Sequence, residues 1–365
     1  MKIEQNNMKP LFLKYRQEFE DAALNVLESG WYVLGRNVKL FEEEFADFVR
    51  AKYCVGLASG LDALWIAVKA LNIGVGDEVI VQANTYIASV MGITINGAKP
   101  VFVEPDEYYN IDSSKIEKAI SKHTKAVLVV HLYGQATNMD EICDICHRYN
   151  LYLIEDCAQA HGAKYRDKFV GTFGDVGCFS FYPTKNIGAF GDAGAIVTND
   201  KKIDEYVRTF RNYGSERRYY NKMIGANSRL DEIQAALLRV KLKHIDEITY
   251  EHVRIAEKYD CMISNEKIIK PVVHSDATSV WHQYVVRCEE REKLIKFLES
   301  KEISTIVHYP IPPYLSEAYE YLKITSNDFP ITQKYADTVL SLPMYFGMNE
   351  EQQKYVVDVI NSFKS

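Results

Sequence analysis

Short apolar runs alternate with helical hydrophobic patterns between about residues 50 and 200. Continuous apolar runs of strand length occur at 53–58, 77–82, 99–104, 126–134, 151–156, 177–183 and 194–199. Helical patterns lie between several of these runs, at 61–71, 86–96 and 138–150. Strands that are buried on both faces are apolar throughout, so this alternation is typical of a mostly parallel sheet covered by helices. The pattern predicts an α/β fold.

The last third of the chain has a different pattern. A long helical pattern over 228–260 opens with Ser228 and Asp231, which fit the S-x-x-D signal for a helix start. Beyond it, strand-like runs at 279–288 and 304–310 are mixed with helical patterns at 289–300, 331–340 and 350–360. This mixture predicts a small α+β unit that the long helical pattern joins to the rest. We therefore predict a large α/β domain over residues 1–245 and a small domain over residues 246–365.

Composition and charge narrow the class of protein. The 365 residues are 47% hydrophobic and 25% charged, which is typical of a soluble globular chain with a large core. The net charge is -7 and basic runs are lacking, so nucleic acid is a poor candidate partner. The first residues carry charges where a signal peptide has an apolar segment, and apolar runs stay well short of the roughly 18 residues of a membrane span. We expect a cytoplasmic protein without a membrane segment.

Seven cysteines are scattered through apolar segments. Their odd number and positions favour reduced thiols over a disulfide framework. Cys143, Cys146 and His147 spell C-x-x-C-H, the pattern of haem attachment. They fall within the helical pattern that Asn138 is expected to cap, in a chain without an export signal. We interpret them as packing residues of a surface helix, and we expect no metal site.

Candidate chemistry lies where predicted strands end, because ligands of open α/β sheets bind at the carboxyl ends of the strands. The first such place is Ala58–Asp62, where small residues lead from a strand into a helix. Backbone N–H groups at a helix start can hold a phosphate. The alternative is a tight connection without a ligand.

A second place is the end of the run LYLIED, where Glu155 and Asp156 follow apolar residues. A carboxylate in apolar surroundings is unfavourable unless a positive group or hydrogen-bond donors meet it. One interpretation is a functional acid that pairs with a bound cation. The other is a helix cap or a structural ion pair.

A third place is the run CFSFYPTKNIGAFGDAG, in which Lys185 follows a strand that contains Ser180. A desolvated lysine is a nucleophile that forms a Schiff base with an aldehyde, whereas most lysines extend to water. Tyr86, just past another strand, either offers its ring to a planar ligand or packs. A lysine, an acid, a phosphate cradle and an aromatic ring together match the needs of pyridoxal phosphate.

The chain resembles a known family in segments that span nearly its whole length. They are SGWYVLGRNVKLFEEEFA, ASGLDAL, HLYGQATNMD, IEDCAQAHGA, FSFYPTKNIGAFGDAGAIVTND, NYGSERRYYNKMIGANSRLDEIQAA, HYPIPPY and LSLP. The family is that of the DegT/DnrJ/StrS-type sugar aminotransferases, within the fold type I, aspartate aminotransferase-like enzymes. The resemblance implies a cofactor that cycles between pyridoxal phosphate and pyridoxamine phosphate.

Carried over position by position, the resemblance assigns roles to the residues that hold the cofactor. It makes Lys185 the Schiff-base lysine and proton shuttle, and Asp156 the partner of the ring nitrogen. It implies contacts to the cofactor ring or phosphate from Gln159, Tyr86, Ser180, Gly60 and Leu61. It also implies that Asn227 reaches the phosphate in the neighbouring subunit, and therefore a homodimer with shared active sites.

The substrate prediction also depends on the resemblance. FYPTKN with Tyr182, followed by GDAG, is similar to the branch that acts at C3 of dTDP-linked 3-keto-6-deoxyhexoses, whereas the C4 branch more often reads FHP-x-K and GEGG. Glutamate is the expected amino donor. No arginine follows Arg291, so the last part of the chain lacks the carboxylate-binding arginine of aspartate aminotransferase-like enzymes. The candidate substrate contacts are Tyr182, Arg229, His308, Tyr309 and Tyr314.

Two other functions stay open at this point. One is a sugar-nucleotide 4-aminotransferase on the same fold, which differs in the position of the new amine. The other is a non-catalytic regulator that binds an effector, because a fold does not fix a function. The combination of Lys185, Asp156 and Ser180 favours the enzyme.

Overall fold

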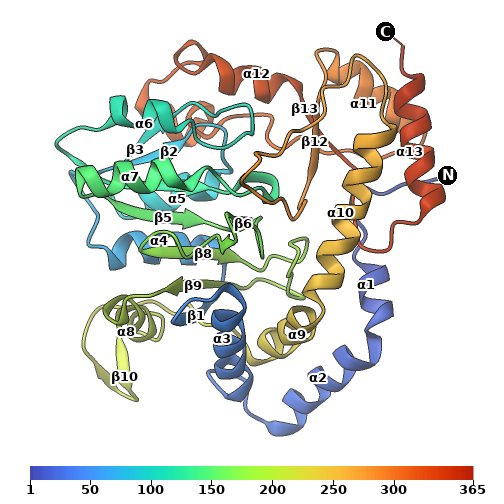
Figure 1. Cartoon of the computed structure of the whole chain (residues 1–365). Coiled ribbons are helices and arrows are strands. Elements are labelled where there is room, and N and C mark those ends of the chain that lie inside the picture. Colours follow the sequence, from blue (N-terminus) through green and yellow to red (C-terminus); the bar gives the residue numbers. More distant parts are fainter. Residues whose placement is uncertain (365) are drawn as a thin grey trace.

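A central sheet of seven strands organises the computed structural model, which describes residues 1–364 (Figure 1). In spatial order its strands are β1 (Tyr53–Leu57), β9 (Gly194–Thr198), β8 (Val176–Ser180), β5 (Tyr152–Asp156), β4 (Thr124–Val130), β2 (Glu78–Gln82) and β3 (Lys99–Val103). β9 is antiparallel to both of its neighbours, and the remaining pairs are parallel. The predicted α/β fold with a mostly parallel sheet is confirmed.

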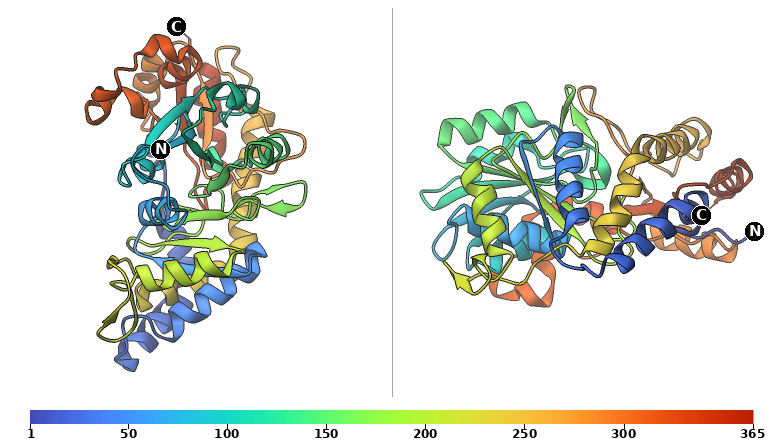
Figure 2. Two further views of the ribbon diagram at one scale, coloured as in Figure 1. Left: turned by 90° about the vertical axis from the view of Figure 1, so that its left-hand side faces the viewer. Right: turned by 90° about the horizontal axis from the view of Figure 1, so that it is seen from below.

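Helices cover both faces of this sheet (Figure 2). One face packs against α4 (Gly60–Ala70), α5 (Ile87–Thr94) and α8 (Lys201–Phe210). The other packs against α3 (Arg36–Val49), α6 (Ser113–Ala119), α7 (Met139–Tyr149) and α9 (Glu232–Lys243). Successive residues of one strand belong to the cores on opposite faces of the sheet. In β4, for example, Val127 belongs to one core and Leu128 to the other. Both faces are buried, which explains why the strands are apolar throughout.

The long helical pattern after Ser228 forms two helices instead of one. α9 ends at Lys243, and α10 (Ile245–Met262) follows after His244. The predicted capping role of Ser228 is wrong, because α9 begins at Glu232 and the Ser228 hydroxyl donates to Asp62 (2.6 Å). The proposed domain boundary at residues 245/246 falls at this junction and stays a prediction.

After α10 the chain builds a smaller α+β unit. Its antiparallel ribbon pairs β12 (Tyr284–Arg287) with β13 (Val339–Leu342). Its helices are α11 (Arg291–Ser300), α12 (Pro330–Thr338) and α13 (Glu350–Ser362), with 3-10 turns η2 (Pro313–Leu315), η3 (Glu317–Leu322) and η4 (Ser326–Asp328). Residues 331–340, predicted as one helix, divide between α12 and β13.

The predicted strand at 304–310 is wrong. Only Ile306 pairs in sheet fashion there, through an isolated bridge to Ser341. β13 already pairs with β12 on its other side, and the segment runs into Pro310, Pro312 and Pro313, which have no N–H to donate. The segment is therefore a connection that passes the carboxyl end of the main sheet.

The N-terminal residues reach the smaller unit before they join the large one. The N-terminus lies beside α13, and α1 (Lys9–Lys14) and α2 (Arg16–Ser29) then run down past α10 to α9 (Figure 1). The remaining short elements are the 3-10 turn η1 (Leu132–Gly134) and two pairs of strands. β6 (Lys164–Tyr165) pairs with β7 (Lys168–Phe169), and β10 (Ser215–Arg217) pairs with β11 (Tyr220–Asn221). Within residues 1–364, no helix is both long and apolar enough to span a membrane.

The C-x-x-C-H motif lies on α7, as predicted. Asn138 is the residue before the helix, although its side chain accepts from Tyr165 instead of capping. Cys146 is buried and Cys143 packs against the same core, and burial raises the pKa of these thiols to about 12 and about 11. The motif therefore supplies packing residues.

Candidate active site

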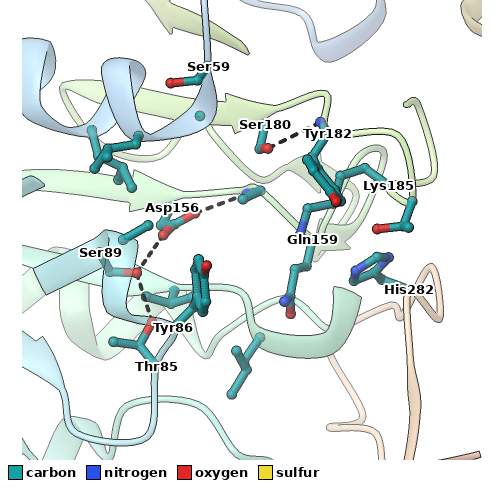
Figure 3. Close-up of a pocket in the computed structure, with 18 of the residues that line it drawn as sticks. Ser59, Thr85, Tyr86, Ser89, Asp156, Gln159, Ser180, Tyr182, Lys185 and His282 are labelled. Carbon is teal, nitrogen blue, oxygen red and sulfur yellow. Dashed lines mark hydrogen bonds between the residues drawn. The ribbon is translucent and has the colours of Figure 1, made fainter. Parts of the chain in front are cut away.

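A cavity of about 410 Å³ lies at the carboxyl ends of the central strands, next to the start of α4 (Figure 3). Its walls come from the large sheet, from α4 and α5, and from the segments around residues 282 and 308. Ten of the predicted site residues line it: Gly60, Leu61, Tyr86, Asp156, Gln159, Ser180, Tyr182, Lys185, His308 and Tyr309. Residues far apart in the sequence are therefore brought to one site.

Asp156 ends β5 on one side of this cavity (Figure 3). Its carboxylate accepts hydrogen bonds from the Ser89 hydroxyl (2.7 Å) and from the N–H of Ala158 (3.1 Å). Burial raises the pKa of Asp156, while these two donors and nearby Lys185 favour its charged form. Neither donor carries a charge, so a cationic group in the cavity would find an acid already held in place.

Lys185 lies opposite Asp156, in the loop between β8 and β9 (Figure 3). Its backbone N–H donates to the carbonyl of Tyr182 (2.8 Å), which fixes the turn that carries it. Desolvation lowers the pKa of Lys185 to about 8, although the Asp156 charge acts in the opposite direction. At pH 7 about a tenth of this amine is therefore unprotonated and nucleophilic, far more than for an ordinary lysine.

The start of α4 forms an anion cradle. Ser59 caps the helix by accepting from the N–H of Asp62 (3.1 Å), and its carbonyl accepts from Ala63 (3.1 Å). Within residues 1–364, the N–H groups of Gly60 and Leu61 have no acceptor. Free N–H groups at a helix start, with the helix dipole behind them, bind phosphate.

Ser180 lies against this helix start so closely that only glycine fits at position 60. A Cβ on Gly60 would stand 2.4 Å from the Cβ of Ser180 and 2.9 Å from its hydroxyl oxygen. The Ser180 hydroxyl therefore lies beside the free N–H groups. This cradle, the acid and the amine fit pyridoxal phosphate, which carries a phosphate, a ring nitrogen and an aldehyde.

We expect Gly60→Ala to weaken cofactor binding at least about tenfold, because the new methyl group must displace Ser180 or the helix start. The measurement is a titration of the apoprotein with pyridoxal phosphate, followed by absorbance. Gly74→Ala is the matched control, since a Cβ there would meet only the Asn96 carbonyl at 3.4 Å. Equal affinities of the two variants would contradict the proposed cradle.

Two tyrosine rings and Gln159 lie on the side of the cavity near η1. Tyr86 and Tyr309 stand 5.1 Å apart between ring centroids, tilted by 35°. Gln159 donates to the Tyr309 hydroxyl (3.0 Å), and its oxygen accepts from the N–H of Tyr133 (2.6 Å). Gln159 therefore holds two parts of the cavity wall together, and its contact with the cofactor stays a prediction.

Three predicted residues lie outside this cavity. Tyr314 is a correction: it is only 1% exposed and packs against Phe102 and Phe329, because the turn after Pro313 folds back onto the core. Asn227 donates to the Tyr213 hydroxyl (2.9 Å), and Arg229 donates to Asn212 (2.9 Å). Both lie near Tyr213, outside the cavity of this chain, and the predicted contact of Asn227 with a neighbouring subunit stays a prediction.

The sequence analysis missed several residues of the site. Ser89 holds Asp156 and is itself within 2.8 Å of the Thr85 hydroxyl. The sequence held a signal for Ser89, because this residue lies one helical turn after Tyr86, in the helix that follows strand β2. His282 and Gln283 also line the cavity. No local signal marks them, since they come from the smaller unit and reach the cavity only through tertiary packing.

Glu155, the neighbour of Asp156, is structural. Its carboxylate accepts from the N–H groups of Gly171, Phe173 and Gly174 (2.7–2.8 Å), and His131 Nε2 lies 3.1 Å away. His131 Nδ1 accepts from Thr137 (3.0 Å), so Nε2 carries the hydrogen. Together with Cys157 these groups are spaced like metal ligands, but the Glu155 oxygens and His131 Nδ1 already accept hydrogen bonds from the protein. The interpretation of Glu155 as a structural residue is favoured.

The chain belongs to the DegT/DnrJ/EryC1/StrS aminotransferase family, which it matches over residues 14–361. A relative from Aneurinibacillus thermoaerophilus, described as dTDP-3-amino-3,6-dideoxy-alpha-D-galactopyranose transaminase, is 49% identical over 98% of both chains. One from Streptomyces venezuelae, described as dTDP-3-amino-3,4,6-trideoxy-alpha-D-glucose transaminase, is 42% identical over 98% of this chain and 95% of the relative. The chain is thus a sugar aminotransferase, as predicted.

Solved structures agree with this assignment. The crystal structure of S. venezuelae DesV in complex with a ketimine intermediate superposes with a TM-score of 0.96, at 41% identity over 99% of this chain and 98% of that one. The structure of NtdA from Bacillus subtilis with bound pyridoxamine phosphate has a TM-score of 0.88, at 28% identity over 95% and 81%. The predicted fold type I architecture and the pyridoxal phosphate cofactor are confirmed.

Proposed function

We propose that this protein transfers an amino group to C3 of a dTDP-linked 3-keto-6-deoxyhexose and releases a dTDP-3-amino-3,6-dideoxyhexose. The observation that carries the proposal is the cavity in which Lys185 faces Asp156 beside the phosphate cradle of α4. The FYPTKN and GDAG segments favour the C3 position, and the A. thermoaerophilus relative carries a name of the same class.

The residues of the cavity have separate tasks in this proposal. Gly60, Leu61 and Ser180 hold the phosphate, and Asp156 holds a positive charge on the ring nitrogen. When bound, pyridoxal phosphate supplies an electron sink that makes the substrate proton acidic. Lys185 moves that proton: its unprotonated amine accepts it, and its ammonium returns it at another atom. Tyr86 packs on the cofactor ring.

We expect covalent capture of the cofactor to depend on pH through Lys185. Its pKa is lowered to about 8, so the nucleophilic amine fraction rises about tenfold per pH unit below that value and levels off above it. The measurement is the rate of aldehyde capture from pyridoxal phosphate between pH 6 and 10, with borohydride trapping to locate the modified lysine. A rate that keeps rising up to pH 10 would show an unshifted lysine.

A neighbouring subunit completes the proposed site. Glutamate is the proposed amino donor, and its carboxylates need a partner there. Among the described residues that line the cavity, Lys185 is the single lysine and arginine is absent. Asn227 and Arg229 lie instead beside Tyr213 (52% exposed), and the nearby residues Asp231 and Glu232 pair with the segment that carries Trp31 (65%) and Tyr32 (53%). Exposed aromatic side chains in one patch are typical of a protein interface. A second copy seated there would receive Asn227 at its phosphate and Arg229 at a substrate carboxylate.

We expect a shared site to allow complementation between two inactive variants, Lys185→Ala and Asn227→Asp. In an equal mixture after subunit exchange, half of the dimers are hybrids, and each hybrid has one intact site. Activity should therefore recover to about a quarter of the wild-type value. Sedimentation measures the dimer, and each variant alone is the control. If Asn227 serves its own chain, mixing restores nothing.

The position of the new amine tests the proposed reaction. We would incubate the holoprotein with glutamate and dTDP-linked 3-keto- and 4-keto-6-deoxyhexoses, and locate the amine in the product by NMR. An amine at C3 supports the proposal, and an amine at C4 supports the alternative 4-aminotransferase. A relative from Geobacillus stearothermophilus, 41% identical, is described as a pleiotropic regulatory protein. Absence of turnover with every keto sugar would therefore favour a regulator.

We also propose a cytoplasmic location for this protein.

A further inference from the structure

The first residues of the chain are anchored on the smaller α+β unit. Ile3 is fully buried, donates its N–H to the carbonyl of Glu302 (2.8 Å) and accepts from the N–H of Ser304 (2.9 Å). The carbonyl of Gln5 accepts from the N–H of Met344 (3.1 Å). We call residues 3–5 the N-terminal strap, which lies beside the cavity wall formed by the smaller unit.

The side chain of Gln5 contacts a residue of the active-site cavity. Its Nε2 donates to Oε1 of Gln283 (3.0 Å), and the two side chains are only 8% and 6% exposed. Gln283 lines the same cavity as Lys185. Since its amide oxygen is turned toward Gln5, its amide nitrogen points the other way. Within residues 1–364 that nitrogen has no acceptor, and it is not sealed inside the protein.

The backbone around Gln283 is fixed to η1, the turn that follows β4 of the large sheet. The N–H of Gln283 donates to the carbonyl of Tyr133 (3.3 Å), and the N–H of Val280 donates to Gly134 (2.9 Å). Gly134 has a φ of +99°, and a Cβ there would stand 2.8 Å from the backbone nitrogen of His282. The approach is therefore close enough to require glycine. With its backbone held, Gln283 can exchange the amide NH2 group for the amide oxygen at the cavity only by rotating its amide.

We propose that Gln283 donates a hydrogen bond from Nε2 to an oxygen of a substrate, and that Gln5 is the positioning residue that holds the Gln283 amide in place. The proposal rests on the proposed aminotransferase function. The donor carboxylate and the oxygens of the keto sugar both offer suitable acceptors. Gln283 is a neutral donor in a cavity whose described lining contains no arginine. It therefore contributes to recognition without adding a charge of its own to the cavity.

Gln5→Glu tests the polarity without removing the contact. A glutamate at position 5 can only accept, so Gln283 must rotate its amide to donate to it and turn its oxygen to the cavity. Gln283→Met removes the donor directly at similar volume. Glu4→Gln, an exposed change in the same strap, is the matched control. For each protein we would measure KM and kcat for glutamate and for the keto sugar separately, the Kd of both ligands by calorimetry, and the Tm.

We expect Gln5→Glu and Gln283→Met to raise KM and Kd for one substrate about tenfold, with kcat within about twofold. The Tm of Gln5→Glu should fall, because the new carboxylate is buried with one neutral donor. An effect on glutamate alone identifies a donor carboxylate as the acceptor, and an effect on the sugar alone identifies a sugar oxygen. Unchanged constants for both substrates in Gln283→Met overturn the proposal. If Gln5→Glu does not fold, Gln283→Met decides. If the wild-type protein turns over no keto sugar, the proposed function fails, and the Kd values still decide the role of Gln283.

Discussion

Lys185→Ala should fold and bind pyridoxal phosphate non-covalently, but lose turnover by at least about 10⁴-fold. The reason is that one amine both captures the cofactor and moves the substrate proton. The phosphate cradle and Asp156 lie on other segments and remain intact in this variant. The measurements are steady-state transamination and the absorption spectrum of the loaded protein, in which the Schiff-base band of the wild type should be missing.

The matched control for this prediction is Lys241→Met. Lys241 is also a buried lysine, and desolvation lowers its pKa to about 8, but it does not line the active-site cavity. Its replacement removes a buried charge without a carboxylate partner, so we expect turnover to be retained. Full activity of Lys185→Ala would refute the assignment of the catalytic lysine. A similar loss in both variants would indicate that the two substitutions act through the fold.

Asp156→Asn should bind the cofactor and lower kcat about 10²–10³-fold. Asparagine has nearly the same shape. Its single oxygen can still accept from the N–H of Ala158 while its NH2 group donates to the Ser89 hydroxyl, but it carries no charge to hold a proton on the ring nitrogen. Without that proton the cofactor is a weaker electron sink. The measurement is the rate of the glutamate half-reaction by stopped-flow absorbance, which separates chemistry from binding of the sugar.

The control for Asp156→Asn is Asp106→Asn. Burial raises the pKa of Asp106 to about 7, and its carboxylate accepts from the N–H groups of Tyr108 and Asn110 (2.9 and 3.0 Å), outside the cavity. The same chemical change there should leave the half-reaction within about twofold of the wild type. Equal rates for Asp156→Asn and the wild type would remove Asp156 from the proposed mechanism.

Two kinds of sequence signal predicted most of the site. Asp156 and Lys185 each follow an apolar run, and the carboxyl ends of such strands meet at one edge of an α/β sheet. Small residues at a strand-to-helix turn marked the cradle at Gly60. These signals are local, because each depends on a strand and on the few residues after it.

Errors arose where distant partners compete with a local pattern. Ser228 has the spacing of a helix cap, but Asp62 takes its hydroxyl and α9 begins four residues later. Tyr314 lies in a polar-looking proline-rich segment, but its ring fills the core beside Phe102. The run at 304–310 has strand composition, but the available sheet edge gives it only one bridge.

The sequence by itself determined the α/β class and the order of most strands and helices, and it predicted the cofactor roles of Lys185 and Asp156. Hydrophobic periodicity and strand-end residues are properties of short segments, so they can be recognised without a fold. Only the tertiary structure decided that Ser89 holds Asp156, that His282 and Gln283 enter the cavity, and that Gln5 contacts Gln283 across 278 positions. Contacts of that separation depend on how the packed units meet, which no local pattern encodes.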